Sequence, residues 1–260
     1  MGLCFHAILE HLNFVECTRS DLELFIGHHL RLWGFSPTFT SAMTEGLWAC
    51  LRTPLGVHLK GMTLRDLPDR YRRNELSFEI MLSHGSPIDG TLINQILALD
   101  PQSKNLPPLP DEFQFSGYLK GSIDLFFKHP DPSGETYFIA DYKSNWLGED
   151  EESTLAHYHP EALSQVMNEH LYLLQSHLYL VAAHRLLKQR MGHAYDPRRH
   201  LGGSLYLFLR GLAGPASYID ESMTAGLYLH RPPHHVTELL SLALDDPDRA
   251  RRQLDSLMYS

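Results

Sequence analysis

The fold is decided by residues 117–146, which read GYLKGSIDLFFKHPDPSGETYFIADYKSNW. Two apolar runs flank a segment from Lys128 to Glu135 that is rich in proline, glycine and aspartate, and these residues favour turns. The alternation of apolar and polar residues beside it is typical of strands. The sequence therefore predicts a β-hairpin whose loop is centred near Pro132.

Polar side chains of this hairpin are expected to converge, because successive side chains of a strand point to opposite faces. One face of the first strand is predicted to carry Tyr118, Lys120, Ser122, Asp124 and Phe126. In the second strand, Asp141 and Lys143 share a face and Tyr142 points away. Antiparallel pairing around Pro132 places position 124 opposite 140 or 141, and a bulge is one way to set the facing.

Two carboxylates and a lysine at neighbouring points of a sheet have a chemical use. Carboxylates are hard oxygen ligands for Mg²⁺, which lowers the pKa of bound water and offsets charge on phosphoryl oxygens. A lysine on the same face can orient that water or stabilise the transition state. The alternative is an exposed Asp141–Lys143 ion pair of little energetic value. Asp and Lys are poor strand formers, however, and the preceding run 137–140 looks buried.

The spacing Asp-x16-Asp-x-Lys, from Asp124 to Lys143, resembles the signature of the PD-(D/E)xK nuclease superfamily. The residues around it closely resemble the C-terminal nuclease domain of the RecB family, the helicase–nuclease subunits of bacterial RecBCD enzymes. This resemblance spans positions 2–211 and is strongest over 117–150 and 172–211.

The resemblance implies an α/β fold of the restriction-endonuclease-like type, with a mixed central sheet flanked by helices. A chain of 260 residues can bury the core of such a domain. We expect a single RecB-type nuclease domain over residues 1–260. Its catalytic core is expected at about 70–211, between an N-terminal helical part at 1–60 and a C-terminal helical extension at 212–260.

The opening of the chain, GLCFHAILE, resembles the GxxxHxxLE start of RecB-type nuclease domains. The resemblance places His6 on the catalytic metal, together with Asp124, Asp141 and the backbone carbonyl of Tyr142. The alternative is a hydrogen-bonded core histidine, since the chain contains 17 histidines. Glu10 is expected on the surface of the helix.

A further acidic residue is expected on a strand at 72–82, which alternates polar and apolar side chains. Glu75, Ser77 and Glu79 would share one of its faces, and the hairpin is expected to pair with it. The family carries a glutamate at the start of this strand, pointing toward the site. Glu75 matches that residue best, Glu79 is the competing assignment, and simple solvent exposure of both glutamates is the other alternative.

Residues 161–190 form the longest expected helix, on the basis of their apolar periodicity. Gln175 and Tyr179 match the QxxxY pattern of RecB-type and related exonucleases, and their spacing puts them on one helix face. There they can contact the DNA backbone or hold the catalytic lysine. Tyr172 matches a further tyrosine of the family pattern, about one turn earlier.

The remaining elements follow from periodicity and capping signals. Helices are expected at 1–33, 41–54, 89–99, 236–244 and from Pro247 to Met258, the last capped by Asp246. A buried strand is expected at 201–211, with Tyr206 and Phe208 as core residues. The acidic run 148–152 is expected to be a solvated loop, and His157 and His159 are not expected to bind zinc because no fourth ligand is evident.

The composition limits the class of protein. A net charge of −9 is awkward for a nucleic-acid enzyme, because phosphate binding favours basic surface. We expect a basic partner to deliver DNA and the isolated domain to bind it weakly. Three cysteines without a CxxC pair suit a reducing cytoplasm and argue against iron–sulfur relatives. The sequence has neither an apolar run near 18 residues nor a GxxxxGK[ST] phosphate loop, so we expect no membrane span and no ATP motor on this chain.

By resemblance, the expected function is that of a Mg²⁺-dependent DNA nuclease, an exonuclease or single-strand endonuclease, in double-strand break repair and recombination. Mn²⁺ or Ca²⁺ are other ions that can occupy the site. The implied partners are single-stranded DNA or duplex ends, a RecC-like subunit and helicase subunits. One alternative is a non-catalytic module that binds DNA ends or a helicase. Another is a stand-alone CRISPR-associated-type exonuclease, which the missing cysteine cluster weakens.

Overall fold

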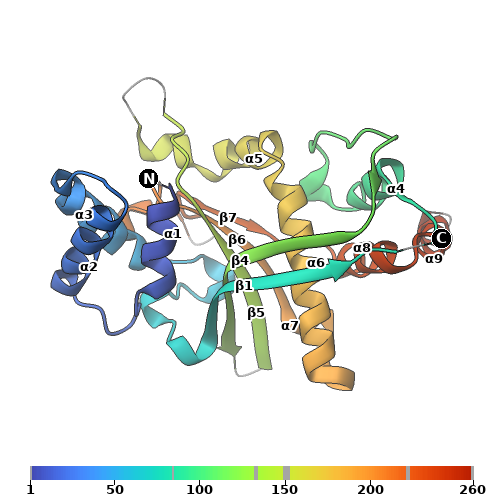
Figure 1. The fold of residues 1–260 in the computed structure, drawn as a ribbon, viewed down its shortest axis with the longest axis horizontal. Coiled ribbons are helices and arrows are strands. Elements are labelled where there is room, and N and C mark those ends of the chain that lie inside the picture. The colour runs from blue at the N-terminus through green and yellow to red at the C-terminus, as the bar shows by residue number, and fades with distance from the viewer. Residues whose placement is uncertain (1, 84, 132–133, 149–152, 221–222, 259–260) are drawn as a thin grey trace.

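A mixed five-stranded sheet forms the centre of the protein in the computed structural model (Figure 1), which describes residues 2–83, 85–131, 134–148, 153–220 and 223–258. Its strand order is β1 (Arg72–Met81), β4 (Tyr118–Asp131), β5 (Gly134–Lys143), β6 (Leu201–Phe208) and β7 (Leu227–His230). A separate pair consists of β2 (Ile88–Asp89) and β3 (Gln114–Phe115).

Strands β5 and β6 run parallel, and the other neighbours in this sheet are antiparallel. A parallel pair needs a long crossover, which the helices between these two strands provide. The mixed sheet flanked by helices confirms the expected α/β class and fits a restriction-endonuclease-like fold.

Helices lie on both sides of the sheet. Figure 1 shows α1, α2 and α3 on one side, α4, α8 and α9 on the other, and α6 near the middle of the molecule. Their bounds are α1 (Gly2–His11), α2 (Arg19–Leu32), α3 (Thr40–Leu51), α4 (Gly90–Leu97), α5 (Pro160–Glu169), α6 (Tyr172–Met191), α7 (Pro197–His200), α8 (His234–Asp245) and α9 (Pro247–Met258). None of the helices built by the described residues combines the length and apolarity needed to span a membrane.

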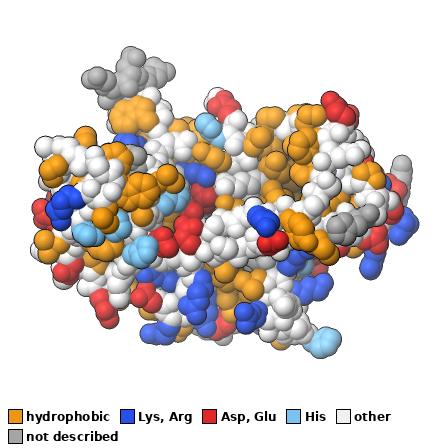
Figure 2. All heavy atoms as spheres, in the orientation of Figure 1, with side chains coloured by type: hydrophobic (Ala, Val, Ile, Leu, Met, Phe, Trp, Pro, Cys, Tyr) orange, Lys and Arg blue, Asp and Glu red, His pale blue; other side chains and the backbone are white. Residues whose placement is uncertain are grey.

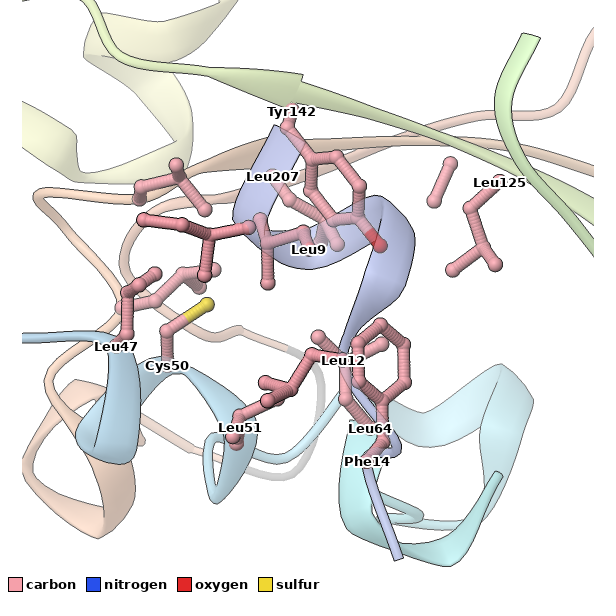
Figure 3. Packing of buried hydrophobic residues seen from close by; sticks show 14 of the residues in the cluster. Leu9, Leu12, Phe14, Leu47, Cys50, Leu51, Leu64, Leu125, Tyr142 and Leu207 are labelled. Atoms are coloured by element: carbon pink, nitrogen blue, oxygen red, sulfur yellow. The ribbon is translucent and has the colours of Figure 1, made fainter. Parts of the chain in front are cut away.

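Two large hydrophobic clusters cover opposite faces of the sheet. One joins α1, α2 and α3 to Leu125, Tyr142 and Leu207, and Figure 3 shows the Tyr142 ring pointing into it near Leu9. The other joins α4, α6, α8 and α9 to the opposite face. Since full burial of one leucine contributes about 1.5–3 kcal/mol, these clusters hold the helices firmly against the strands.

The alternation of side chains along β4 is interrupted at Asp124. Ile123 and Phe126 pack in the second cluster, whereas Leu125 packs in the first. The ladder pairs beside this point are Asn74–Leu125 and Leu76–Ile123, and Glu75 between them has φ +47°. The left-handed conformation of Glu75 turns β1, and beyond this point the side chains of the paired strand β4 point to the opposite face from the one that strict alternation predicts. The expectation that Ser122, Asp124 and Phe126 share one face is therefore wrong.

The hairpin has the expected register, but its strands are longer than expected. Leu125 pairs with Ala140, which puts Asp124 level with Asp141. Strand β4 runs to Asp131 and β5 starts at Gly134, so the loop expected at 128–135 is mostly strand. The expected loop centre, Pro132, lies outside the described residues, as do positions 149–152 of the expected acidic loop.

The helix expected at 161–190 is broken in two. Leu171, with φ +56°, separates α5 from α6, although no glycine or proline marks the break. Strand β7 was not expected from the sequence, because residues 211–233 around it are rich in turn-forming residues. Asp246 does cap the last helix, since its Oδ1 accepts a hydrogen bond of 2.9 Å from the Arg249 amide.

Candidate active site

The two central strands separate just beyond the pair Leu125–Ala140. There the Asp124 carboxylate takes the place of a main-chain acceptor, because its Oδ2 receives the Tyr142 amide hydrogen at 2.8 Å. We call this place, formed by Asp124, Asp141 and Tyr142, the strand fork. At the strand fork, the charged side chains of Asp124 and Asp141 lie between β4 and β5, where their ladder ends.

His6 reaches the fork from α1, whose neighbouring residues Ile8 and Leu9 are fully buried. His6 Nδ1 lies 3.3 Å from Asp124 Oδ2, and this contact raises the pKa of His6, although burial acts in the opposite direction. Figure 2 shows acidic and histidine atoms side by side near the middle of this face, between the positions of α1 and β4.

Glu75 lies beside the same carboxylate. The ligand atoms of His6, Glu75 and Asp124 all lie within 4.8 Å of one another, and Ser122 donates a hydrogen bond of 2.8 Å to Glu75 Oε2. Glu75 itself has a left-handed backbone conformation, which costs a non-glycine residue about 1–3 kcal/mol. Glu79 instead forms an exposed ion pair with Lys120, so only Glu75 of the two expected glutamates lies at the fork.

Lys143 enters from the opposite face of the sheet. Its Nζ lies 2.7 Å from Asp141 Oδ2, in a pair that is mostly buried. Gln175 Oε1 accepts a hydrogen bond from Lys143 at 3.1 Å. The ammonium also lies 4.0 Å from the centre of the Tyr172 ring and 5.2 Å from that of Tyr206, where cation–π attraction adds to its anchoring.

Helix α6 holds the lysine through Gln175. Gln175 Nε2 donates to the Tyr179 hydroxyl at 2.9 Å, which fixes the amide so that its oxygen faces Lys143. Gln175 and Tyr179 were expected either to contact the DNA backbone or to hold the lysine. In the structure, Gln175 contacts Lys143. Tyr172 contributes its ring to the same anchoring.

The polar role of Tyr206 was not expected from the sequence, which predicted only a core residue. Its ring is fully buried, as expected of a core residue. Its hydroxyl, however, donates to the Tyr172 carbonyl at 2.9 Å and lies 3.2 Å from Gln175 Oε1. A buried tyrosine hydroxyl usually requires a partner, which was the available signal.

The negative charge of the Asp141 carboxylate is only partly balanced by Lys143. Burial raises the pKa of Asp141 to about 6, and the Asp124 carboxylate acts in the same direction, while Lys143 opposes both. Among the described residues, the partner of Asp141 Oδ2 is the Lys143 ammonium, 2.7 Å away. Two carboxylates with one lysine leave a deficit of positive charge that a bound cation would offset.

The backbone carbonyl of Tyr142 faces the fork. The next carbonyl, that of Lys143, accepts a hydrogen bond from the Leu209 amide and so points toward β6. Carbonyls alternate along a strand, and the N–H and C=O of one residue project to the same side. The Tyr142 carbonyl therefore lies on the side of Asp124, where its amide points.

The donor set of the fork suits a hard divalent cation. His6, Glu75 and Asp124 form the grouped side chains, and the Tyr142 carbonyl adds a neutral oxygen. Asp141, expected in the same ligand set, lies outside this group, and its Oδ2 pairs with Lys143. Carboxylate and carbonyl oxygens are the preferred ligands of Mg²⁺, Mn²⁺ and Ca²⁺.

A second group could also ligate an ion, namely Asp100, His177 and His230, all buried. Asp100 Oδ2 lies 2.8 Å from His230 Nε2 and 3.2 Å from His177 Nε2, and it accepts a hydrogen bond of 2.6 Å from Ser103. Ser176 contacts the far nitrogen of His230 at 2.7 Å. These hydrogen bonds satisfy the polar atoms facing Asp100, so the fork is the more open candidate for a metal.

This buried group makes stability depend on pH. Burial lowers the pKa of His177 to about 4 from an ordinary 6.5. Although burial pushes the pKa of Asp100 upward, hydrogen bonds from both histidines and Ser103 hold it well below its usual range. At His177 the unfolded chain therefore binds more protons than the folded chain between about pH 6.5 and 4.

We expect the contribution of His177 to the free energy of unfolding to be fully present above pH 6.5 and to fall on acidification toward pH 4, by up to about 1.4 kcal/mol per unit. A His177→Gln variant keeps a donor toward Asp100 and removes this titration. Urea melts at pH 7 and 4.5 should show a smaller loss for the variant. Equal losses would contradict the assignment to His177.

The chain is similar in sequence to RecB subunits of RecBCD enzymes from several bacteria. No protein family model matches the chain. The chain is 36% identical to the RecBCD enzyme subunit RecB of Escherichia coli (strain K12) over 234 residues, which is 89% of the chain and 18% of that subunit. It is 34% identical to the RecB subunit of Mycolicibacterium smegmatis over 260 residues, 94% of the chain and 24% of the subunit. It is 35% identical to that of Mycobacterium tuberculosis (strain CDC 1551 / Oshkosh) over 264 residues, 94% of the chain and 23% of the subunit.

Proposed function

The chain belongs to the RecB family and spans about a fifth of the length of its curated relatives, and from this premise we propose that it is a metal-dependent deoxyribonuclease. The proposed reaction is hydrolysis of DNA phosphodiester bonds, in the repair and recombination of broken DNA. The strand fork carries this proposal, because it sets the grouped ligands His6, Glu75 and Asp124 beside the buried pair Asp141–Lys143.

Mg²⁺ is the proposed cofactor, held by His6, Asp124, Asp141 and the Tyr142 carbonyl, with Glu75 as a further ligand. The buried Asp141 carboxylate, beside a second carboxylate at Asp124, and the hard donors of the fork support this assignment. When bound, the ion would supply a water of lowered pKa and positive charge for the phosphoryl oxygens.

Lys143 acts on the reacting phosphate in this proposal. Its ammonium is held between Gln175 Oε1 and the rings of Tyr172 and Tyr206. A pre-positioned cation needs little reorganisation when charge develops on the phosphate. Lys143 would thus orient the attacking water or stabilise the transition state, and Gln175 and Tyr179 would keep it in place.

The proposed setting is a cytoplasmic complex with DNA, a RecC-like subunit and helicase subunits. The relatives are named as subunits of a larger enzyme, and the chain matches only part of each. Its net charge of −9 favours delivery of DNA by partners over tight binding of its own. All three cysteines are free and buried, as a reducing compartment allows.

Metal removal tests the proposal. The purified chain, incubated with linear single-stranded DNA and Mg²⁺ at low salt, should degrade the DNA. EDTA should abolish degradation, and excess Mg²⁺ or Mn²⁺ should restore it, because the fork then regains its cation. Denaturing gels with end-labelled DNA give the readout.

Two outcomes would count against this function. Degradation that persists in EDTA would exclude the proposed cofactor. DNA binding without degradation, at high protein and with helicase and RecC-like subunits added, would favour a non-catalytic binding module, which the acidic charge of the chain also suits.

A further inference from the structure

A cavity of about 610 Å³ opens between α3 and the ends of β5 and β6. Its lining is largely apolar and includes Phe5, Phe39, Met43 and Leu47. Two further lining residues are Trp146, which is exposed, and Arg210, an exposed residue that carries a planar cation. We call this cavity the aromatic groove.

Trp146 and Arg210 are fixed against each other. The guanidinium carbon of Arg210 lies 5.2 Å from the centre of the Trp146 ring, and Arg210 Nε donates to the Ser144 carbonyl at 3.2 Å. The two residues follow the ends of β5 and β6, which are parallel and therefore end at the same edge. The indole remains 47% exposed despite this contact.

The aromatic groove adjoins the strand fork through the chain itself. Ser144, which lines the groove, directly follows Lys143. Phe5, on the other side, directly precedes His6 on α1. The groove and the fork are therefore one residue apart along both β5 and α1.

We propose that Trp146 and Arg210 form a base-stacking subsite, which holds an unpaired nucleotide of the strand whose phosphate lies at the strand fork. This inference rests on the proposed nuclease function. Every nucleobase has an aromatic face that can stack on indole, and arginine adds charge for the neighbouring phosphate. An apolar peptide would leave the Arg210 charge unused. A base inside a duplex is already stacked, so the subsite selects single strands and frayed ends.

Binding of a short oligothymidylate, followed by fluorescence anisotropy in EDTA so that no hydrolysis occurs, tests the subsite. Trp146→Ala should weaken binding about tenfold, since one stacked base contributes about 1–3 kcal/mol. Trp146→Phe should keep most of the affinity. Phe113→Ala is the matched control, because Phe113 is also 47% exposed but makes an edge-to-face contact with Phe115 outside the groove.

Intrinsic fluorescence provides a second readout. Single-stranded DNA should quench the emission of the parent protein, and Trp146→Phe should lose most of this quenching while Trp33 and Trp48 remain. A blunt duplex of equal length should quench little. The subsite is overturned if Trp146→Ala binds as the parent does, an outcome that would leave the groove to a polypeptide, or if the duplex quenches equally. A weakened Trp146→Ala together with no Mg²⁺-dependent cleavage by the parent, even with helicase and RecC-like subunits added, would support the subsite and reject the nuclease.

Discussion

Replacing Lys143 by alanine should lower the rate of DNA cleavage about a thousandfold. The loss of one pre-organised group that stabilises developing charge costs about 10²–10³ in rate, and Lys143 is also the cation paired with Asp141. Lys143→Arg should not rescue the rate, because a planar guanidinium cannot occupy the position of a compact ammonium between Tyr172 and Tyr206. Single-turnover cleavage of labelled DNA at saturating protein measures this effect.

The matched control is Lys120→Ala. Lys120 is an exposed lysine that pairs with Glu79 on the same sheet, and its loss should leave the rate within about twofold. Oligonucleotide affinity should stay near that of the parent in the Lys143 variant, since its effect is expected on chemistry. A Lys143→Ala rate within a few-fold of the parent would reject the proposed role.

The second large effect is expected from Asp124→Asn. Asparagine can still accept the Tyr142 amide hydrogen, so the local fold should survive. It removes the negative charge that lies beside His6 and Glu75. The proposed Mg²⁺ site then loses one of its carboxylate ligands. Isothermal titration should show metal affinity reduced at least about tenfold, and cleavage should fall below detection at Mg²⁺ concentrations that saturate the parent.

Asp255→Asn on the exposed face of α9 provides a charge-matched control, which should bind metal normally. Asp141→Asn is a less selective variant, because it leaves Lys143 without its buried partner, at a cost of about 3–5 kcal/mol of stability. Parental metal affinity in Asp124→Asn would show that the ion binds elsewhere, with Asp100 and the two buried histidines as the first alternative.

The hairpin register could be predicted because its signals are local. A turn-rich segment set the centre of symmetry near Pro132, and the pairing Leu125–Ala140 follows from that centre alone. The QxxxY spacing likewise predicted that Gln175 and Tyr179 share a helix face, and they are in fact joined by a hydrogen bond.

The facing along β4 could not be predicted in the same way. It depends on the left-handed backbone of Glu75, in a different strand, and nothing in the sequence around Glu75 indicates that conformation. The break at Leu171 is similar, because tertiary packing of α5 and α6 overrides a continuous helical pattern.

The buried group around Asp100 was missed because its members are far apart in the chain. Asp100 and His230 are 130 positions apart, and each contributes one polar atom to the same contact. One signal was available, since His177 is a polar residue on the buried side of α6, beside Ser176. A buried histidine requires a partner from elsewhere in the fold.

The strand fork also has a thermodynamic consequence for the sheet. Where Leu125 pairs with Ala140, the Asp124 carboxylate replaces part of the main-chain ladder between β4 and β5, so the two central strands are joined through a side chain that we propose as a metal ligand. An ion bound there ties the strands together, and its binding energy becomes part of the folding energy, adding about 2.7 kcal/mol at a hundred times its dissociation constant. Exchange of the Tyr142 amide with solvent should then slow as the ion concentration rises. The same cation that serves hydrolysis would act as a cross-link of the sheet.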